Sequence, residues 1–179
     1  MNRSHHHSSA TWVLERVHDA LVNQKGSKRI KQLVYLLYLI KFYNIKEQQL
    51  NRVIERFNSS AAADDQDAQH PLSKMMGNAP TFLVESILER FTQTFEGKIK
   101  ISERLRDKLL SYILCLALTL DGYHLEVSNI AKDIGISVTK ATNIVRELGC
   151  RVETRKHEGI QVKVAVLAIP LTFPQKRKY

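Results

Sequence analysis

The sequence contains few of the residues that mark disulfide-bonded, metal-binding or membrane-spanning proteins. Its 179 residues include 2 Cys, 4 Pro and 7 Gly. Cys115 and Cys150 form neither a C-x-x-C motif nor a zinc spacing, so a reducing compartment is expected. Cys115 lies within an apolar run and is predicted to be in the core. The longest apolar run, residues 33–40, is too short to span a bilayer, and we expect no signal peptide.

The motifs of common enzyme classes are also missing. There is no glycine-rich phosphate loop, no G-x-S-x-G and no H-E-x-x-H, and four histidines are scattered along the chain. We therefore expect no catalytic residues, cofactor, metal or small-molecule substrate. His5, His6 and His7 could bind a metal, but residues 1–10 are more typical of a purification tag and are excluded from the fold.

Positive charge is abundant and unevenly distributed. The formal net charge is +9 and 44% of the residues are hydrophobic, which predicts a folded protein with an anionic partner. From Lys98 onward there are 15 Lys and Arg against 8 Asp and Glu, a net charge of +7; the preceding residues have 12 against 10, a net charge of +2. The second half is therefore the favoured site for nucleic acid.

The first half has the periodicity of four helices and a hairpin. Helical spacing covers residues 12–24, 28–43, 47–57 and 81–91, with Thr11 as a possible first cap and Gly26 as a possible C-cap. Residues 58 to about 80 have no periodicity and are predicted to form a loop or disordered insertion that can be shortened. Glu96-Gly97 lies between two alternating arms and predicts a hairpin.

The same order of elements returns in the second half. Ser102 is a predicted N-cap for a helix over 103–120, and Ser128 and Ser137 are predicted caps of two short helices that end near 135 and 148. Residues 151–156 and 161–169 are strand-like, with a turn at 157–159. We predict a mainly α fold with small β-hairpin wings, in two tandem winged-helix domains. The predicted boundaries are 1–10 for a tag-like tail, 11–101 with the insertion at 58–80, 102–170, and 171–179 for a basic C-terminal tail.

The two short helices at 129–148 have the pattern of a helix-turn-helix. On the second of them the apolar residues cluster on one side, which is expected to pack inward. Thr142 is expected at the flank of the opposite, polar side. The residues predicted to contact DNA lie on that polar side and on the following hairpin: Thr139, Lys140, Asn143, Arg146, Arg151, Arg155, Lys156 and Lys163.

Three interpretations of this motif stay open at this point. It could bind DNA mainly through phosphates, it could read the base sequence, or it could dock on protein. Only one Asn and one Arg occupy the centre of the polar side, and Glu147 beside them would repel phosphate, which disfavours sequence reading. In the first half the corresponding helix carries Glu85 and Glu89, which disfavours a phosphate-facing surface there.

Three stretches together resemble one known family. They are "LVYLLYLIKFYNIK" (33–46), "RLRDKLLSYILCLALTLDGYHLEVSNIAKDIGISVTKATNIVRELGCRV" (104–152) and "VAVLAIPLTFPQKRK" (164–178). They are similar to the C-terminal part of the 49-kDa subunit of RNA polymerase I, the polymerase-associated factor family. The resemblance runs from about residue 12 to the end of the sequence, and the middle stretch is the most specific.

The resemblance implies a tandem winged-helix domain related to the initiation factor TFIIE. It also implies DNA binding near the polymerase cleft, other RNA polymerase I subunits as partners, and roles in initiation and elongation on ribosomal RNA genes in the nucleus and nucleolus. No membrane partner is implied. The alternative is a protein-docking module of a larger complex that makes no direct DNA contact.

Overall fold

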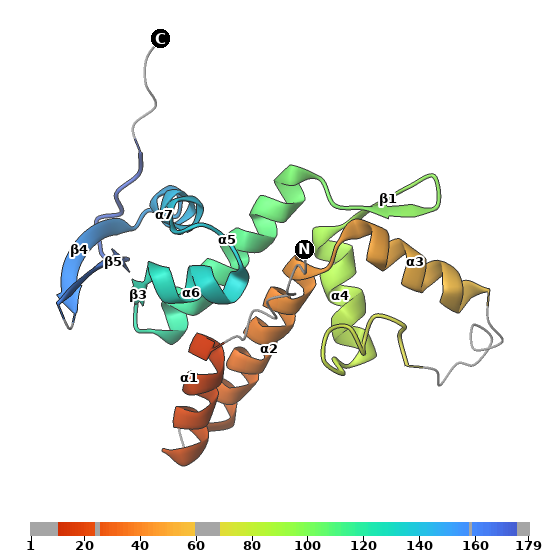
Figure 1. Ribbon diagram of the computed structural model, residues 1–179, viewed down its shortest axis with the longest axis horizontal. Helices are drawn as coiled ribbons and strands as arrows, with labels where there is room; N and C mark the ends of the chain where they lie inside the picture. The colour runs from red at the N-terminus through yellow and green to blue at the C-terminus, as the bar shows by residue number, and fades with distance from the viewer. Residues whose placement is uncertain (1–10, 24–25, 60–68, 158, 175–179) are drawn as a thin grey trace, which may run out of the picture. The chain divides into compact units, whose positions relative to one another are not determined.

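The chain is mainly helical and carries two small antiparallel sheets (Figure 1). The computed structural model describes residues 11–23, 26–59, 69–157 and 159–174. This confirms the predicted class of a mainly α fold with small hairpins. In chain order the elements are α1 (Thr11–Val22), α2 (Gly26–Asn44), α3 (Glu47–Asn58), α4 (Thr81–Phe91), β1 (Gln93–Phe95), β2 (Lys98–Lys100), α5 (Glu103–Leu120), β3 (His124–Glu126), α6 (Val127–Ile134), α7 (Val138–Glu147), β4 (Arg151–His157) and β5 (Ile160–Val166).

The chain folds into two compact units that are not consecutive segments. One unit joins residues 1–37 to residues 111–179, and the other comprises residues 38–110. Helices α2 and α5 each contribute residues to both units. The predicted boundary at 101/102 lies inside the second of these units, so the compact division differs from the predicted one. The assignment of two winged-helix domains to 11–101 and 102–170 stays a prediction.

In the unit formed by residues 38–110, polar side chains of α3 hold the predicted hairpin. The turn between β1 and β2 has φ angles of 49° at Glu96 and 72° at Gly97, the conformation that two-residue hairpins favour. The Asn51 amide donates to the Ile99 carbonyl and its carbonyl oxygen accepts from the Ile99 N–H, both at 2.8 Å. The Glu47 carboxylate accepts from the Ile101 N–H at 3.1 Å. The edge of β2 that does not pair with β1 is therefore hydrogen-bonded to side chains of α3.

The second half of the predicted loop at 58–80 contains no helix or strand, as expected, but it is ordered and packed rather than a disordered insertion. Residues 69–80 form turns that pack into the unit, with Leu72, Met76 and Ala79 fully buried. Ser73 is also buried, and its hydroxyl donates to the Ala79 carbonyl. The apolar residues are too irregularly spaced to give a helix or strand signal, so the sequence did not reveal their burial. Residues 60–68 lie outside the described residues.

In the other unit, a side chain from α6 caps the first turn of α1. The Val13 N–H donates to the Asp133 carboxylate at 3.1 Å, across 120 positions of sequence. Thr11, the predicted cap, is already part of the helix. A buried carboxylate thus satisfies N–H groups that open a helix and have no partner within it.

An arginine from α1 and another from α2 bind the end of α5. The Arg16 guanidinium makes a bidentate pair with Asp121, at 2.9 and 2.8 Å, and lies 3.8 Å from the centre of the Trp12 ring. Arg29 donates to the Leu120 carbonyl at 2.8 Å. Arg29, one of the basic residues near the start of α2, therefore helps to hold α2 against the end of α5.

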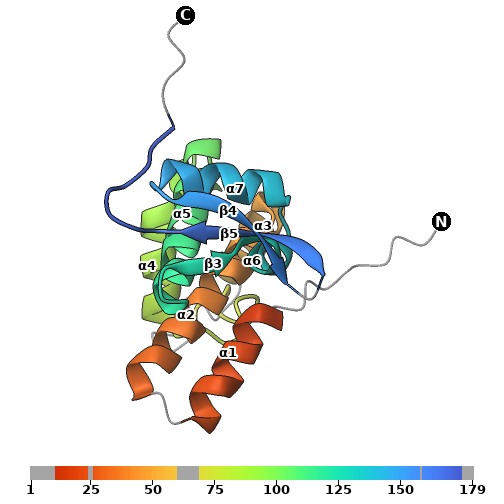
Figure 2. The same ribbon diagram turned by 90° about the vertical axis from the view of Figure 1, so that its left-hand side faces the viewer.

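The second sheet has the order β3-β5-β4 and lies against helices of the same unit (Figures 1 and 2). β4 pairs with β5 from Arg151↔Val166 to His157↔Ile160, close to the prediction, although β5 ends at Val166 rather than at residue 169. β3 was missed, because only three residues pair with β5 and the sequence around them has turn signals.

The predictions about helix caps and about Cys115 have mixed outcomes. Ser137 accepts from the Lys140 N–H at 3.1 Å and Ser102 accepts from the Leu105 N–H at 3.4 Å, which confirms both as caps. Ser128 is not a cap, since α6 already begins at Val127. Gly26 opens α2 rather than closing α1, and Cys115 is exposed rather than in the core. Burial raises the pKa of the Cys150 thiol to about 11.

Candidate nucleic-acid interface

A short turn joins α6 to α7 and orients them as a helix-turn-helix pair. Gly135 closes α6 in the left-handed conformation, with φ of 77°, and its N–H donates to the carbonyls of Ala131 and Lys132. Two residues later Ser137 caps α7. The turn therefore has a glycine stop and a serine start, of which the sequence analysis predicted the serine cap.

Helix α7 buries one side and exposes the other as predicted. Its buried residues include Ala141, Ile144 and Val145. Thr142, predicted at the flank of the polar side, is instead buried, and its hydroxyl donates to the Val138 carbonyl at 2.7 Å. The four residues of α7 predicted to contact DNA are all exposed: Thr139, Lys140, Asn143 and Arg146.

The β4–β5 hairpin divides the remaining predicted residues between its two faces. Residues that are paired across the two strands lie on the same face of the sheet, and every second residue along a strand shares that face. One face therefore carries three pairs: Val152 with Ala165, Thr154 with Lys163, and Lys156 with Gln161. Ala165 and its partner Leu125 on β3 are fully buried on this face, which we call the helix-side face. The exposed lysines Lys156 and Lys163 extend the helix-side face toward the hairpin turn.

The opposite face, which we call the outer face, carries both arginines and a carboxylate on β4 and the buried Val164 and Val166 on β5. Arg151, Glu153 and Arg155 alternate along β4 and therefore share this face. Arg155 donates to the Glu153 carboxylate at 2.8 Å, and this hydrogen bond is the main cause that lowers the pKa of Glu153. The charge of Arg155 is thus offset locally, whereas Lys156 on the helix-side face has no carboxylate beside it on β4.

Helix α4 has a different character. Phe82 is 70% exposed at its start, and Glu85 and Glu89 are exposed one and two turns later on the same side. Carboxylates at these positions repel phosphate. The polar side of α4 thus suits a protein surface better than a nucleic acid.

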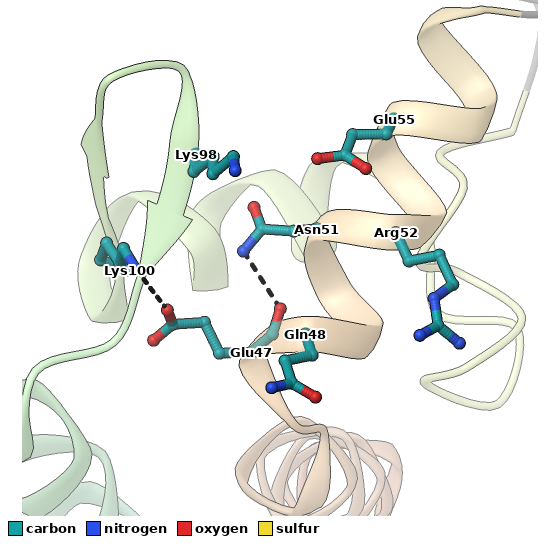
Figure 3. A pocket seen from close by; sticks show the side chains of 7 residues that line it. All are labelled: Glu47, Gln48, Asn51, Arg52, Glu55, Lys98 and Lys100. Carbon is teal, nitrogen blue, oxygen red and sulfur yellow. Dashed lines mark hydrogen bonds and ion pairs between the residues drawn. The ribbon is translucent and has the colours of Figure 1, made fainter.

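A shallow hollow of about 310 Å³ lies between α3 and the β1–β2 hairpin (Figure 3). Lys100 and Glu47 form an ion pair across it at 3.1 Å, and Asn51 donates to the Glu47 carbonyl at 3.1 Å. Arg52, Lys98 and Glu55 complete a lining of mixed charge. Because the charges nearly balance, this hollow does not favour a polyanion.

Two further observations concern the described part of the chain only. It contains no group of three or more His, Cys, Asp or Glu side chains that could hold a metal ion. None of its helices is long and apolar enough to cross a bilayer.

Comparison with known proteins gives consistent matches. A family model described as "A49-like RNA polymerase I associated factor" matches residues 2–174. The match begins inside the stretch that resembles a purification tag, and residues 1–10 lie outside the described residues. The chain is 36% identical over 119 residues to DNA-directed RNA polymerase I subunit rpa49 of Schizosaccharomyces pombe, covering 60% of this chain and 28% of that protein. It is 24% identical over 177 residues to DNA-directed RNA polymerase I subunit RPA49 of Saccharomyces cerevisiae, covering 88% and 38%. The chain therefore spans well under half the length of these relatives.

Proposed function

The chain belongs to the family of A49-like RNA polymerase I associated factors, and we propose that it is a non-catalytic, DNA-binding part of that polymerase. It binds duplex DNA largely without sequence specificity. In the nucleolus it supports initiation and elongation on ribosomal RNA genes, together with other subunits of the enzyme. The names of the two yeast relatives, both RNA polymerase I subunits, support the assignment to this polymerase, and DNA binding is the step that we add.

We further propose that both halves are winged helices. In the second half, α6 and α7 are followed by the β4–β5 hairpin, and β3 completes a three-stranded sheet. In the first half, α3 and α4 are followed by the β1–β2 hairpin. The repeated order of helix, helix and hairpin supports this assignment, although only the second sheet has a third strand.

The observation that carries the DNA proposal is the shared exposure of cations on α7 and the hairpin. Lys140 and Arg146 are exposed on α7, and Lys156 and Lys163 are exposed on the helix-side face of the hairpin. Lysine and arginine side chains neutralise phosphates, and the resulting release of counterions drives binding whatever the base sequence. Asn143 and Arg146 are the exposed side chains of α7 of the kinds that most often read base edges, and Asn143 carries no charge that would also bind phosphate.

Competition between two unrelated duplexes tests this proposal. We expect both duplexes to displace a labelled random duplex with similar midpoints. Asn143→Ala should change the difference in binding free energy between the two duplexes by less than about 1 kcal/mol, the lower end of the contribution of a base contact. A larger change would mean that α7 reads sequence. Failure of the parent chain to bind either duplex would contradict DNA binding altogether.

A second function, docking on protein, is favoured for α4. Its exposed side combines Phe82 with Glu85 and Glu89, an aromatic anchor beside negative charge. Charge reversal of the two glutamates should leave DNA binding no weaker. If it abolished DNA binding while the fold persisted, α4 would belong to the DNA interface.

A further inference from the structure

Helix α4 carries a row of four residues that faces away from its buried side. The spacing i, i+3, i+4 and i+7 places these side chains together on a helix, and we call them the α4 row: Phe82, Glu85, Ser86 and Glu89. Phe82 is 70% exposed, more than any other aromatic side chain among the described residues, and both glutamates are exposed as well. The row is therefore accessible to another molecule.

The two carboxylates of the α4 row do not stabilise the helix that carries them. Glu85 and Glu89 are four positions apart, and like charges at this spacing destabilise a helix. Glu89 also lies in the last turn of α4, where the partial negative charge of the helix end disfavours a carboxylate. Within the part of the chain that the structure describes, no ion pair or hydrogen bond engages either carboxylate. Both charges are therefore available to cations of another molecule.

Two neighbouring side chains could supply positive charge, but neither compensates these carboxylates. Arg90 lies about 100° round the helix from Glu89. Burial lowers the pKa of His70 from its ordinary value of 6.5, although the negative charge of Glu85 acts in the opposite direction. The His70 Nδ1 accepts a hydrogen bond from the Leu72 N–H at 3.2 Å, which requires that nitrogen to be unprotonated. The imidazole is therefore neutral near pH 7 and leaves the charge of Glu85 unbalanced.

We propose that the α4 row is a docking site for an arginine-bearing segment of another protein. This inference rests on the protein-docking role proposed for α4, and it names the chemistry of the partner. Side chains three or four positions apart on a helix are about 5–6 Å apart, so one guanidinium can stack on the Phe82 ring and also pair with Glu85. Arginine suits both contacts better than lysine, because its planar fork binds a carboxylate at two points and stacks on aromatic rings. A second cation of the segment pairs with Glu89.

The charge of the α4 row selects protein over nucleic acid as the occupant. Two adjacent carboxylates repel phosphate, whereas a cationic protein segment is complementary to them. The two yeast relatives are named as subunits of RNA polymerase I, and a subunit contacts other protein chains of its enzyme. A basic segment of such a chain is the occupant that fits both observations.

The test measures binding of fluorescein-labelled hexa-arginine and hexa-lysine peptides to the whole chain by fluorescence anisotropy, without DNA. We expect the parent to bind hexa-arginine severalfold more tightly than hexa-lysine. Glu85→Gln with Glu89→Gln should weaken hexa-arginine binding on the order of tenfold, since this double change removes two ion pairs. Failure of the parent to bind hexa-arginine, or equal binding of the two peptides, would overturn the inference.

A matched control separates the α4 row from the overall charge of the chain. Glu55→Gln with Glu103→Gln removes the same charge from exposed positions on α3 and α5. This variant should bind hexa-arginine nearly as tightly as the parent. If the two double variants lost the same affinity, the peptide would be sensing net charge only, and the inference would be overturned.

Phe82→Leu tests the aromatic contact. It keeps an apolar side chain and removes the ring, so the ratio of the hexa-arginine and hexa-lysine affinities should approach one. An unchanged ratio would overturn the stacking of arginine on Phe82.

Thermal melting shows whether the carboxylates instead serve the fold. The melting temperature of the variant with Glu85→Gln and Glu89→Gln should not fall, because the two charges repel each other within α4. A marked fall would show that they stabilise the unit, and would overturn the inference. The docking role of α4 fails separately, if charge reversal of the two glutamates abolishes DNA binding, so the two failures are distinguishable.

Discussion

The carboxylate of Asp133 on α6 accepts a hydrogen bond from the backbone N–H of Val13 at the start of α1. Asp133 is 1% exposed and Val13 is fully buried, so the contact lies inside the unit formed by residues 1–37 and 111–179. It fastens the first described helix to the helix-turn-helix pair. The stability of the candidate DNA interface is therefore linked to a contact far from it in sequence.

Replacing Asp133 tests how much this cap contributes. Asp133→Ala should lower the free energy of unfolding by about 1–2 kcal/mol, the usual cost of removing a helix cap. Asp133→Asn keeps an acceptor oxygen of the same shape and should cost less. Urea denaturation of the three proteins measures both changes, and equal stability of parent and alanine variant would show that the cap contributes nothing.

The same carboxyl predicts a pH dependence. Burial raises the pKa of Asp133 above its ordinary value of 3.8, although N–H groups of residues 11–13 act in the opposite direction. The folded state then holds the proton more tightly than the unfolded state, so this contribution is full below the ordinary pKa and is lost as pH rises through the folded value. The stability of the parent relative to Asp133→Asn should therefore fall as pH rises above 3.8. A rise over that range would contradict the raised pKa.

The hydrogen bonds between Asn51 and Ile99 predict a local effect in the other unit. Asn51→Ala leaves the Ile99 N–H and carbonyl without these partners and should cost about 1–3 kcal/mol. Gln48→Ala is the matched control, because Gln48 is exposed and lines the same hollow. Hydrogen exchange at the Ile99 amide should quicken in the first variant and not in the second.

The packed part of the expected insertion gives a further comparison. Met76 is fully buried and its neighbour Met75 is partly exposed. Met76→Ala should lower the free energy of unfolding by about 2–5 kcal/mol, as for other buried large-to-small changes, and Met75→Ala should cost clearly less. Similar small costs at both positions would restore the original interpretation of a removable loop.

The sequence predicted what depends on local pattern. The Ser137 cap marked the start of α7, and Glu96-Gly97 located the first hairpin. Helical spacing also identified which residues of α7 are exposed, apart from Thr142. Each of these features is set by neighbours within a few positions, which a single sequence displays directly.

The features that were missed depend on contacts between distant segments. Asp133 caps a helix 120 positions away, and β3 exists because β5 returns to pair with it. The register of the β4–β5 hairpin determines which residues share a face. It places Arg155 beside Glu153 on the outer face and Lys156 on the helix-side face. The return of residues 171–173 to Gly149 likewise had no periodic signal. Sequence alone could name the cations but could not sort them by face.

The most direct test of DNA binding is the salt dependence of affinity for a random-sequence duplex, measured by fluorescence anisotropy. If Lys140, Arg146, Lys156 and Lys163 each neutralise a phosphate, the log–log slope of the parent should be about −3.6 or steeper. Lys156→Gln with Lys163→Gln on the helix-side face should make it shallower by about 1.8, whereas Arg151→Gln with Arg155→Gln on the outer face should change it less. Melting temperatures should stay close to that of the parent, since exposed charges contribute little to folding. A parent chain whose affinity for duplex DNA is absent, or independent of salt, would contradict the account.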